Sequence, residues 1–251
     1  MVDLGGRTIV ITGGNSGLGL AMAHGVGSAG ANVVIWSRTP SRNEDAVAEL
    51  EEAGITASAV ACDTAEEDAV SDAMAETIDR YGRVDSMFAN AGIAAAAAYT
   101  DTTLDEWRRV LRTNLDGTFL CTRAAARHFT ERGEGGSIVV VSSMISRYGG
   151  AGQAAYTTSK NGLIGLGRTL AVELARDRVR VNILIPGWTA TAMNTHLRED
   201  EKFLRATTSR TPARRWAQPE EFHEVARFLA DPTLTFHTGN EVVVDGGYTI
   251  Y

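Results

Sequence analysis

The sequence predicts an α/β fold in which one doubly wound parallel sheet of about seven strands is flanked by helices. Short apolar runs alternate along the chain with amphipathic helical stretches, as they do in βαβ units. The connections between them are short, which favours right-handed crossovers. The chain has 251 residues, of which 44% are hydrophobic, and neither repeats nor a linker divide it. We therefore expect a single domain over residues 1–251.

The first half of the chain contains four strand-like runs separated by helical stretches. Residues 7–12 are a β-branched run typical of a buried strand. A glycine-rich turn and a helical stretch at 20–29 follow. The helix expected at 66–81 carries acidic residues in its first turn, where they oppose the helix dipole. The other elements expected here are strands at 32–36, 56–61 and 84–89 and a helix at 44–53.

The second half continues the alternation with a long helical stretch at 104–132. Residues 188–215 are polar and weakly periodic, and we expect them to form a mobile cover over the site. A helix at 219–229 has a proline near its first turn, a favoured position. The other elements expected here are strands at 137–143, 178–185 and 241–244 and a helix that ends at residue 176.

Composition excludes several classes of function. The net charge of −7, without basic runs, argues against nucleic acid and anionic membranes as partners. No run reaches the roughly 20 apolar residues that span a bilayer, and the first apolar run, which begins at Thr8, is too short for a signal peptide. Cys62 and Cys121 are too few for a disulfide framework and suit a reducing compartment. We expect a cytoplasmic protein.

A tyrosine and a lysine form the first candidate for chemistry. Tyr156 and Lys160 are spaced i and i+4, which places both on one helix face. Free tyrosine titrates near pH ~10, and a neighbouring cation lowers that pKa, so the phenol can exchange a proton with a ketone or alcohol. Ser143 ends the strand at 137–143, where its hydroxyl would face the ligand crevice. Taken alone, a Tyr-x-x-x-Lys pair is more often an ordinary surface pair.

A glycine-rich turn follows the first strand. Gly13, Gly17 and Gly19 would let the backbone approach a pyrophosphate, while the next helix offers free N–H donors. Their spacing, Gly-x-x-x-Gly-x-Gly, differs from the commonest dinucleotide fingerprint. The alternative is a plain tight turn. The position of the glycine-rich turn in a βαβ unit favours nucleotide binding over this alternative.

The end of the second strand predicts which dinucleotide binds. Ser37-Arg38 follows this strand, Arg42 lies close behind, and no acid precedes Glu44. An arginine suits the 2′-phosphate of NADP(H), whereas NAD(H) sites carry a carboxylate for the ribose hydroxyl. NADP(H) is therefore favoured and NAD(H) remains possible, since Arg38 could be a solvated surface residue. Ser16 supplies no second cation from the glycine turn.

Taken together, the motifs resemble those of the short-chain dehydrogenase/reductase family, in its short single-domain branch. They occur in the family's order over essentially the whole chain, as Thr12-Gly13-Gly14-Asn15-Ser16-Gly17-Leu18-Gly19, Asn90-Ala91-Gly92, Asn114, Ser143, Tyr156-x-x-x-Lys160, Pro186-Gly187-x-x-x-Thr191 and Asp245-Gly246-Gly247. Length and glycine spacing disfavour the extended branch of epimerases and dehydratases. The resemblance implies a Rossmann-type fold and an NAD(P)(H)-dependent oxidoreductase that interconverts a ketone and a secondary alcohol.

The resemblance also implies roles for the catalytic residues. Tyr156 would be the acid/base, and Ser143 would hold and polarise the carbonyl oxygen. Lys160 would bind the nicotinamide ribose and lower the tyrosine pKa, while Asn114 would hold a water of the proton relay. Taken singly, Asn114 could instead be a mid-helix polar residue that bonds its own backbone.

Cofactor contacts follow from the same resemblance. Asp63 would meet the adenine, the turn at 90–92 would lie against the adenosine ribose, and Thr191 would contact the carboxamide. As alternatives, Asp63 could cap a helix and Pro186 could simply end a strand. The expected cofactor contacts are Gly13, Asn15, Ser16, Gly17, Leu18, Gly19, Ser37, Arg38, Asp63, Asn90, Ala91, Gly92, Tyr156, Lys160, Pro186, Gly187, Thr189 and Thr191.

The substrate is predicted to be a neutral, largely apolar ketone or secondary alcohol. Residues 94–98 are five alanines, which would form an uncharged wall. Cations of the cover, at Arg198, Lys202 and Arg205, are expected to be solvated. A sugar or polyol and a 3-oxoacyl thioester are the alternatives. The expected substrate contacts are Ser143, Ile145, Tyr148, Tyr156, Trp188 and Met193.

Two non-enzymatic alternatives use the same fold. A catalytically silent dinucleotide sensor would be expected to lack part of the serine, tyrosine and lysine set, which is complete here. The second non-enzymatic alternative is a structural subunit that supports an active paralogue. The resemblance further implies a homotetramer formed through the two long helices and the C-terminal segment, where residues 248–251 would be buried. We expect no metal.

Overall fold

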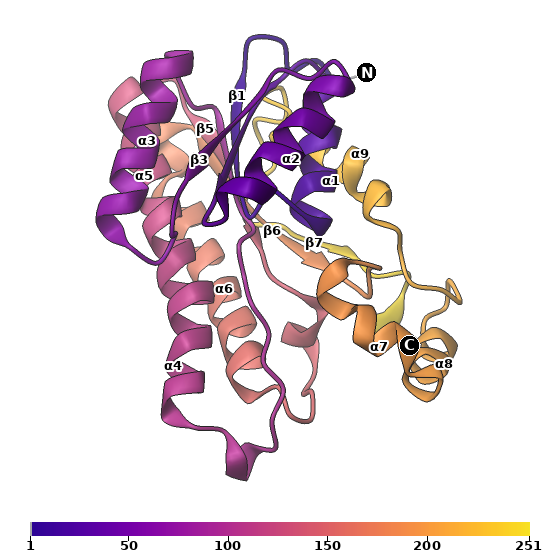
Figure 1. The fold of residues 1–251 in the computed structure, drawn as a ribbon. Coiled ribbons are helices and arrows are strands. Elements are labelled where there is room, and N and C mark those ends of the chain that lie inside the picture. Colours follow the sequence, from indigo (N-terminus) through magenta and orange to yellow (C-terminus); the bar gives the residue numbers. More distant parts are fainter. Residues whose placement is uncertain (1) are drawn as a thin grey trace.

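The computed structural model describes residues 2–251, which form one seven-stranded parallel sheet with helices on both sides (Figure 1). The strand order is β3-β2-β1-β4-β5-β6-β7. Because this order reverses between β1 and β4, the loops after these two strands diverge and open a crevice at the carboxyl edge. The strands are β1 (Thr8–Thr12), β2 (Asn32–Ser37), β3 (Ala57–Ala61), β4 (Ser86–Ala89), β5 (Gly136–Val141), β6 (Val179–Pro186) and β7 (Glu241–Val244).

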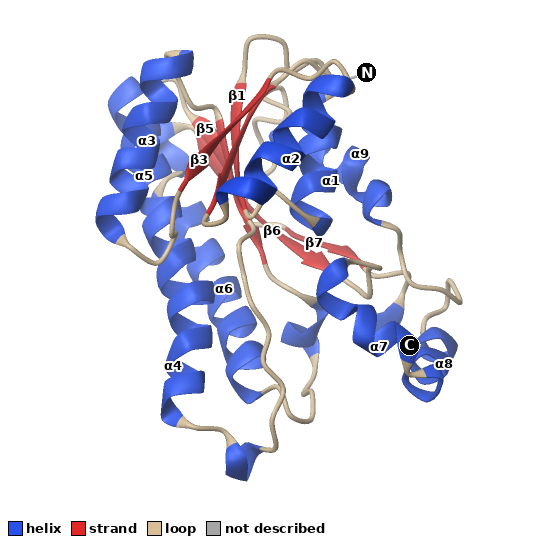
Figure 2. Ribbon diagram, in the orientation of Figure 1, coloured by secondary structure: helices blue, strands red, loops and turns tan. Residues whose placement is uncertain are grey.

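Helices cover both faces of the sheet, as Figure 2 shows. One face is covered by α1 (Gly17–Gly27), α2 (Pro40–Glu52) and α9 (His223–Ala230). The other is covered by α3 (Glu67–Tyr81), α5 (Gly117–Arg132) and α6 (Ala154–Glu173), and α4 (Leu104–Leu111) packs beside α6. Two short helices, α7 (Thr195–Glu199) and α8 (Glu201–Arg210), lie beyond the carboxyl ends of β6 and β7 (Figure 1).

The two layers of helix explain the composition of the strands. Successive side chains of a strand point to opposite faces. On β1, Val10 joins the core under α3 and α5, while Ile9 and Ile11 join the core under α1 and α9. All five residues of β1 are buried, which is the pattern of a parallel sheet covered on both faces. The predicted fold class is therefore confirmed.

The long helix expected at 104–132 is interrupted. α4 ends at Leu111, a π-helical turn spans Arg112–Asp116, and α5 begins at Gly117. The wider turn brings Asn114 to full burial. Hydrophobic periodicity does not reveal a π turn, because each of its residues is compatible with an ordinary helix. Such turns often occur at functional sites.

Other boundaries differ from the sequence prediction near the crevice. β5 ends at Val141, so Ser143 lies in the turn after the strand and caps a 3₁₀ turn at Met144–Arg147. The cover at 188–215 contains α7 and α8, which its weak periodicity did not predict. Within residues 2–251, no helix is long and apolar enough to cross a membrane.

Candidate active site

A cleft of about 600 Å³ opens at the carboxyl edge of the sheet, where the strand order reverses. The loops that follow β1 to β6 line it, together with residues of α6 and α7. Every residue expected to contact cofactor or substrate lies on its wall, whereas the side chain of Asn114 is buried behind it. The fold thus brings residues from across the sequence to one continuous site.

The glycine turn has the shape that a pyrophosphate requires. A Cβ on Gly19 would lie 2.3 Å from the carbonyl oxygen of Gly13, so the start of α1 packs directly on the turn. Gly17 has a φ of +53°, a conformation that favours glycine. Ser16 is the N-cap residue of α1, and within residues 2–251 its hydroxyl does not cap the helix. The first turn of α1 therefore presents free N–H donors to the cleft.

The end of β2 presents positive charge at the far end of the cleft. Arg38 is largely exposed, and its Nη1 lies 3.9 Å from Oδ2 of Asp63, a long ion pair. Arg42, on the first turn of α2, lines the same end. Two guanidinium groups with one loosely paired carboxylate suit an anionic ligand at this end.

The turn after β4 is hydrogen-bonded to Thr12, the last residue of β1. The hydroxyl of Thr12 accepts hydrogen bonds from the backbone N–H groups of Asn90 and Ala91, each at 2.9 Å. Nδ2 of Asn90 donates to the carbonyl oxygen of Thr12, also at 2.9 Å. A Cβ on Gly92 would lie 3.5 Å from Nζ of Lys160. The turn is thus rigid, and it lies close to the lysine.

Lys160 is 4% exposed, and burial lowers its pKa to about 8. Its Nζ donates a hydrogen bond to the carbonyl oxygen of Val141 at 2.9 Å, at the end of β5. The same Nζ lies 5.6 Å from the centroid of the Tyr156 ring. The lysine is therefore held beside the tyrosine on the cleft wall, as the i, i+4 spacing predicts.

The pKa of Tyr156 differs from the sequence expectation. Burial raises it, and contact with the Ser143 hydroxyl opposes that change only in part. Lys160 was expected to bring this pKa below its ordinary value, and in the protein alone that prediction is wrong, because the desolvation of the phenolate dominates. The phenol stays protonated at neutral pH. This is the form that donates a proton to a ketone.

Asn114 lies buried behind the cleft wall. Its Oδ1 accepts from the backbone N–H of Ile93 at 2.8 Å, and its Nδ2 donates to the Ile93 carbonyl and to the Ser159 hydroxyl, each at 3.0 Å. These bonds tie the loop after β4 to α6 one residue before Lys160. The side-chain amide is committed to protein partners, which leaves the main chain of the π turn as the group that could hold a water.

The substrate end of the cleft has aromatic walls. The indole of Trp188 stacks on Trp216, with ring centroids 4.9 Å apart. Tyr148 lies 5.7 Å from Tyr248, and the guanidinium of Arg210 lies over both rings, at 5.0 Å and 4.3 Å. Trp188 and Tyr148 are thus fixed by the cover and by the C-terminal segment.

Several cleft residues were not singled out from the sequence. His196 and Leu197 line the cleft from the cover, and Leu197 lies four residues after the predicted contact Met193, a helical spacing that could have identified it. Gln153, at the N-cap of α6, also lines it. Asn43, on α2, was missed because it carries no motif, and it bonds to two of the predicted cofactor contacts.

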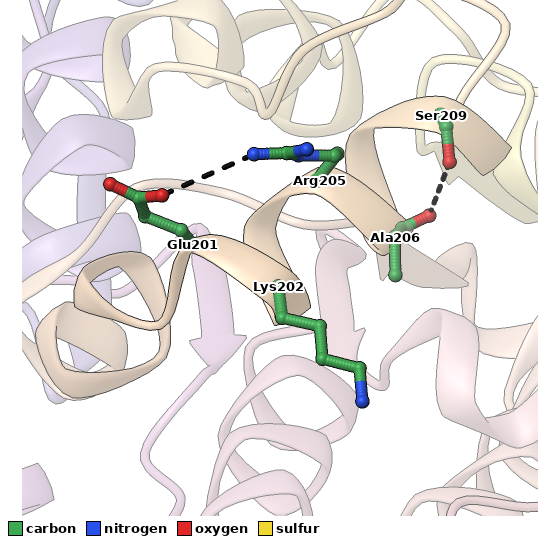
Figure 3. Close-up of a pocket in the computed structure, with 5 residues that line it drawn as sticks. All are labelled: Glu201, Lys202, Arg205, Ala206 and Ser209. Atoms are coloured by element: carbon green, nitrogen blue, oxygen red, sulfur yellow. Dashed lines mark hydrogen bonds and ion pairs between the residues drawn. The ribbon is translucent and has the colours of Figure 1, made fainter.

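A second hollow lies along α8, as Figure 3 shows. Arg205 and Glu201 form an i, i+4 ion pair of 4.0 Å there, with side chains 83% and 91% exposed. Lys202, on the same helix, points away from this ion pair (Figure 3). Such exposed charges are screened by solvent. They fit the expectation that the cations of the cover are solvated.

Comparisons with known proteins agree with this site. The family model described as Enoyl-(Acyl carrier protein) reductase matches residues 13–249. The chain is 35% identical over 245 residues to L-rhamnose 1-dehydrogenase (NAD(P)(+)) of a Sphingomonas species, covering 97% of this chain and 96% of the relative. It is 38% identical over 245 residues to the cis-4-hydroxycyclohexanecarboxylate dehydrogenase of Sinomonas cyclohexanicum, with the same coverage.

Among solved structures, a gluconate 5-dehydrogenase from Burkholderia cenocepacia in complex with NADP and tartrate matches with a TM-score of 0.95. The two chains are 34% identical, and the match covers 99% of this chain and 97% of that one. The likeness to dehydrogenases thus extends over nearly the whole chain, in sequence and in fold.

Proposed function

We propose that this protein reduces a neutral, largely apolar ketone with NADPH. The chain belongs to the short-chain dehydrogenase/reductase family, and it is an NAD(P)(H)-dependent oxidoreductase that acts on CH–OH groups. One observation carries the substrate class. Within residues 2–251, the lysines and arginines that line the cleft are Arg38 and Arg42, at the far end, and Lys160. Near Tyr156 the rest of the wall is mainly alanine, isoleucine, methionine and aromatic rings, and Lys160 is assigned to the cofactor ribose and bonded to Val141. A buried substrate anion would therefore find no free lysine or arginine among the described residues that line the cleft there.

The residues of the cleft suit the dinucleotide along its whole length. The glycine turn and α1 would hold the pyrophosphate, Arg38 and Arg42 the 2′-phosphate, and Lys160 the nicotinamide ribose. NADP in the related gluconate 5-dehydrogenase supports this assignment. The bound cofactor supplies the hydride that the reaction needs.

The protein's part in the reaction is to orient the ketone and to move a proton. Ser143 would donate a hydrogen bond to the carbonyl oxygen and place it against the phenol of Tyr156. Tyr156, whose phenol is protonated at neutral pH, would transfer its proton to that oxygen as the alcohol forms. Asn114 would support the relay by holding Ser159 and the loop at Ile93 in place. The complete set argues against a silent sensor.

A panel of carbonyl compounds tests the substrate class. We expect NADPH oxidation with cyclic, uncharged ketones such as substituted cyclohexanones, and at least tenfold lower kcat/KM with a keto-sugar acid, whose carboxylate would be buried without a cation. Initial rates are followed at the absorbance of reduced nicotinamide, with NADH as the matched comparison. Equal or better turnover of the keto acid would reject the proposed substrate, and a preference for NADH would reject the proposed cofactor.

A sugar or polyol is the second candidate. The L-rhamnose and gluconate dehydrogenases among the relatives support it. Gln153 and His196 line the cleft and could bind hydroxyl groups. A neutral sugar carries no carboxylate that would be buried without a cation, so it is a better candidate substrate than a sugar acid. Adding L-rhamnose to the panel, assayed in the oxidation direction with NADP⁺, distinguishes the two substrate classes.

The pKa of Lys160 predicts how cofactor affinity depends on pH. Burial places this pKa at about 8, so the free protein loses the ammonium as the pH rises through that value. Affinity for NADPH should therefore fall above pH 8, by at most about tenfold per pH unit. Fluorescence titration of NADPH between pH 7 and 9.5 measures it, and Lys160→Met serves as the control, with weaker but pH-independent binding. A flat wild-type profile would contradict the role assigned to Lys160.

The remaining expectations concern assembly and location. We propose a homotetramer in the cytoplasm. Ile250 is 90% exposed and Tyr251 is 75% exposed, which supports a contact through the C-terminal segment, whereas Tyr248 is buried within its own chain. Cys62 and Cys121 are free and buried, in keeping with a reducing compartment. Light scattering of the purified protein separates a tetramer from a monomer.

A further inference from the structure

Asn43 is a buried amide on the first turn of α2, next to the end of β2 where the cofactor's 2′-position would lie. It is 5% exposed. Its Nδ2 donates to the carbonyl oxygen of Ser37 at 3.1 Å, and its Oδ1 accepts from Nδ2 of Asn15 at 2.8 Å. Asn15 Nδ2 also donates to the hydroxyl of Ser37 at 2.7 Å. The three residues thus form a closed network, through the backbone carbonyl and the hydroxyl of Ser37, that joins the glycine turn, β2 and α2.

Asn43 occupies a core-facing position of α2, where an apolar residue would be expected. The buried positions of α2 are Asn43, Ala46 and Leu50, a helical stripe that faces the core. A polar residue on such a stripe costs free energy unless its polar atoms are bonded. Both polar atoms of the Asn43 amide are bonded, and both bonds lead to residues of the cleft wall. An apolar side chain of similar size could fill the space but could not orient those residues.

The network sets the direction of the Ser37 hydroxyl proton. A serine hydroxyl has one proton to donate and can accept at its oxygen. Because the oxygen of Ser37 accepts from Asn15, its proton is directed away from that amide. Ser37 lines the cleft beside Arg38 and Arg42. A hydroxyl donor between two guanidinium groups matches a phosphate, whose oxygens accept charge-assisted hydrogen bonds.

We propose that Asn43 is a positioning residue for cofactor selectivity: by fixing Asn15 and Ser37, it aims the Ser37 hydroxyl at the 2′-phosphate of NADP(H). This inference rests on the NADP(H) preference proposed above. It adds that the preference depends on a buried amide that does not itself line the cleft, as well as on the arginines after β2.

Two adenosine ligands that differ in one phosphate isolate the effect. Calorimetric titration with 2′,5′-ADP and with 5′-AMP measures the contribution of the 2′-phosphate without any ketone. The wild-type protein should bind 2′,5′-ADP more tightly. Asn43→Ala should weaken 2′,5′-ADP binding about tenfold, the effect of one hydrogen bond to a charged group, and change 5′-AMP binding less than twofold. Ser41→Ala, an exposed change on the same helical turn, is the matched control and should alter neither affinity.

A second variant keeps the test decisive if Asn43→Ala folds poorly. Ser37→Ala removes the proposed donor while Asn15 keeps its bond to Asn43, so the fold should persist, as thermal unfolding will show. It should cause the same loss of 2′,5′-ADP affinity. In the double variant the two losses of affinity should not add, because both substitutions remove the same interaction, the one between the Ser37 hydroxyl and the 2′-phosphate. Additive losses would overturn the inference.

The possible failures are distinguishable. If the wild-type protein binds 2′,5′-ADP and 5′-AMP equally, the proposed NADP(H) preference is wrong and this inference is wrong with it. If the wild type discriminates and both variants discriminate equally well, the preference holds and the role of Asn43 is overturned. If Asn43→Ala weakens both ligands to the same extent, Asn43 has a general structural role, which also overturns the proposal.

Discussion

Replacing Tyr156 with phenylalanine is expected to leave a folded, NADPH-binding protein whose kcat falls by about 10²–10⁴-fold, the usual contribution of a general acid. The phenol, the proposed proton donor, lies on the cleft wall beside Lys160 and in contact with Ser143. Phenylalanine keeps the ring and its packing, so the cofactor site should be preserved. The change removes only the proton and the oxygen that carries it.

The measurement pairs turnover with cofactor binding. Ketone reduction is followed by NADPH absorbance, and the dissociation constant of NADPH by fluorescence. Tyr99→Phe is the control, since Tyr99 is 80% exposed and does not line the cleft. If Tyr156→Phe retains kcat within tenfold of the wild type, another group supplies the proton. A parallel loss of NADPH affinity would instead assign Tyr156 mainly to binding.

The largest expected effect on stability is at Asp85, on the edge of the sheet opposite the cleft. Its carboxylate is 8% exposed and accepts from Nε of Arg83 at 3.0 and 2.9 Å, from Nη1 of Arg7 at 3.0 Å and from the backbone N–H of Thr8 at 3.0 Å. Arg132, also largely buried, lies 3.4 Å away. Asp85→Ala removes the buried carboxylate that these cations share. We expect a loss of about 3–5 kcal/mol in the free energy of unfolding.

Urea unfolding of the two proteins at pH 7 measures this loss. Glu134 provides the matched control, because it pairs with the same Arg83 at 3.0 Å but is 58% exposed. Glu134→Ala should cost at most about 1 kcal/mol, the range of a surface ion pair. Equal effects of the two substitutions would show that burial of the carboxylate does not determine its contribution.

The same carboxylate predicts a dependence of stability on pH. Burial acts to raise the pKa of Asp85, but hydrogen bonds from Arg83, Thr8 and Arg7 outweigh it and the pKa is lowered. A depressed carboxylate pKa stabilises the fold above the unfolded value of about 4 and loses that contribution as the pH falls below it. Asp85→Ala should therefore narrow the difference in Tm between pH 7 and pH 3.5. If the substitution leaves this Tm difference unchanged, groups other than Asp85 cause the loss of stability in acid.

The order of strands and helices followed from the sequence because local patterns determine it. β-branched runs, short connections and a glycine turn after the first strand act over a few residues, and they predicted the parallel sheet and β7 (Glu241–Val244) with its bounds. The i, i+4 spacing of Tyr156 and Lys160 likewise placed them together on α6. The prediction was least accurate where the chain departs from a regular period, as at the π turn of Asn114.

By itself, the sequence determined the fold class, the family and the side chains that meet in the cleft, since each depends on residue type and on spacing along the chain. Only the tertiary structure decided the surroundings of those side chains. Burial raises the pKa of Tyr156 despite the nearby ammonium, and packing turns the Asn43 amide toward Ser37 and Asn15. Desolvation and hydrogen-bond direction depend on atoms brought together from distant parts of the chain, so local patterns do not specify them.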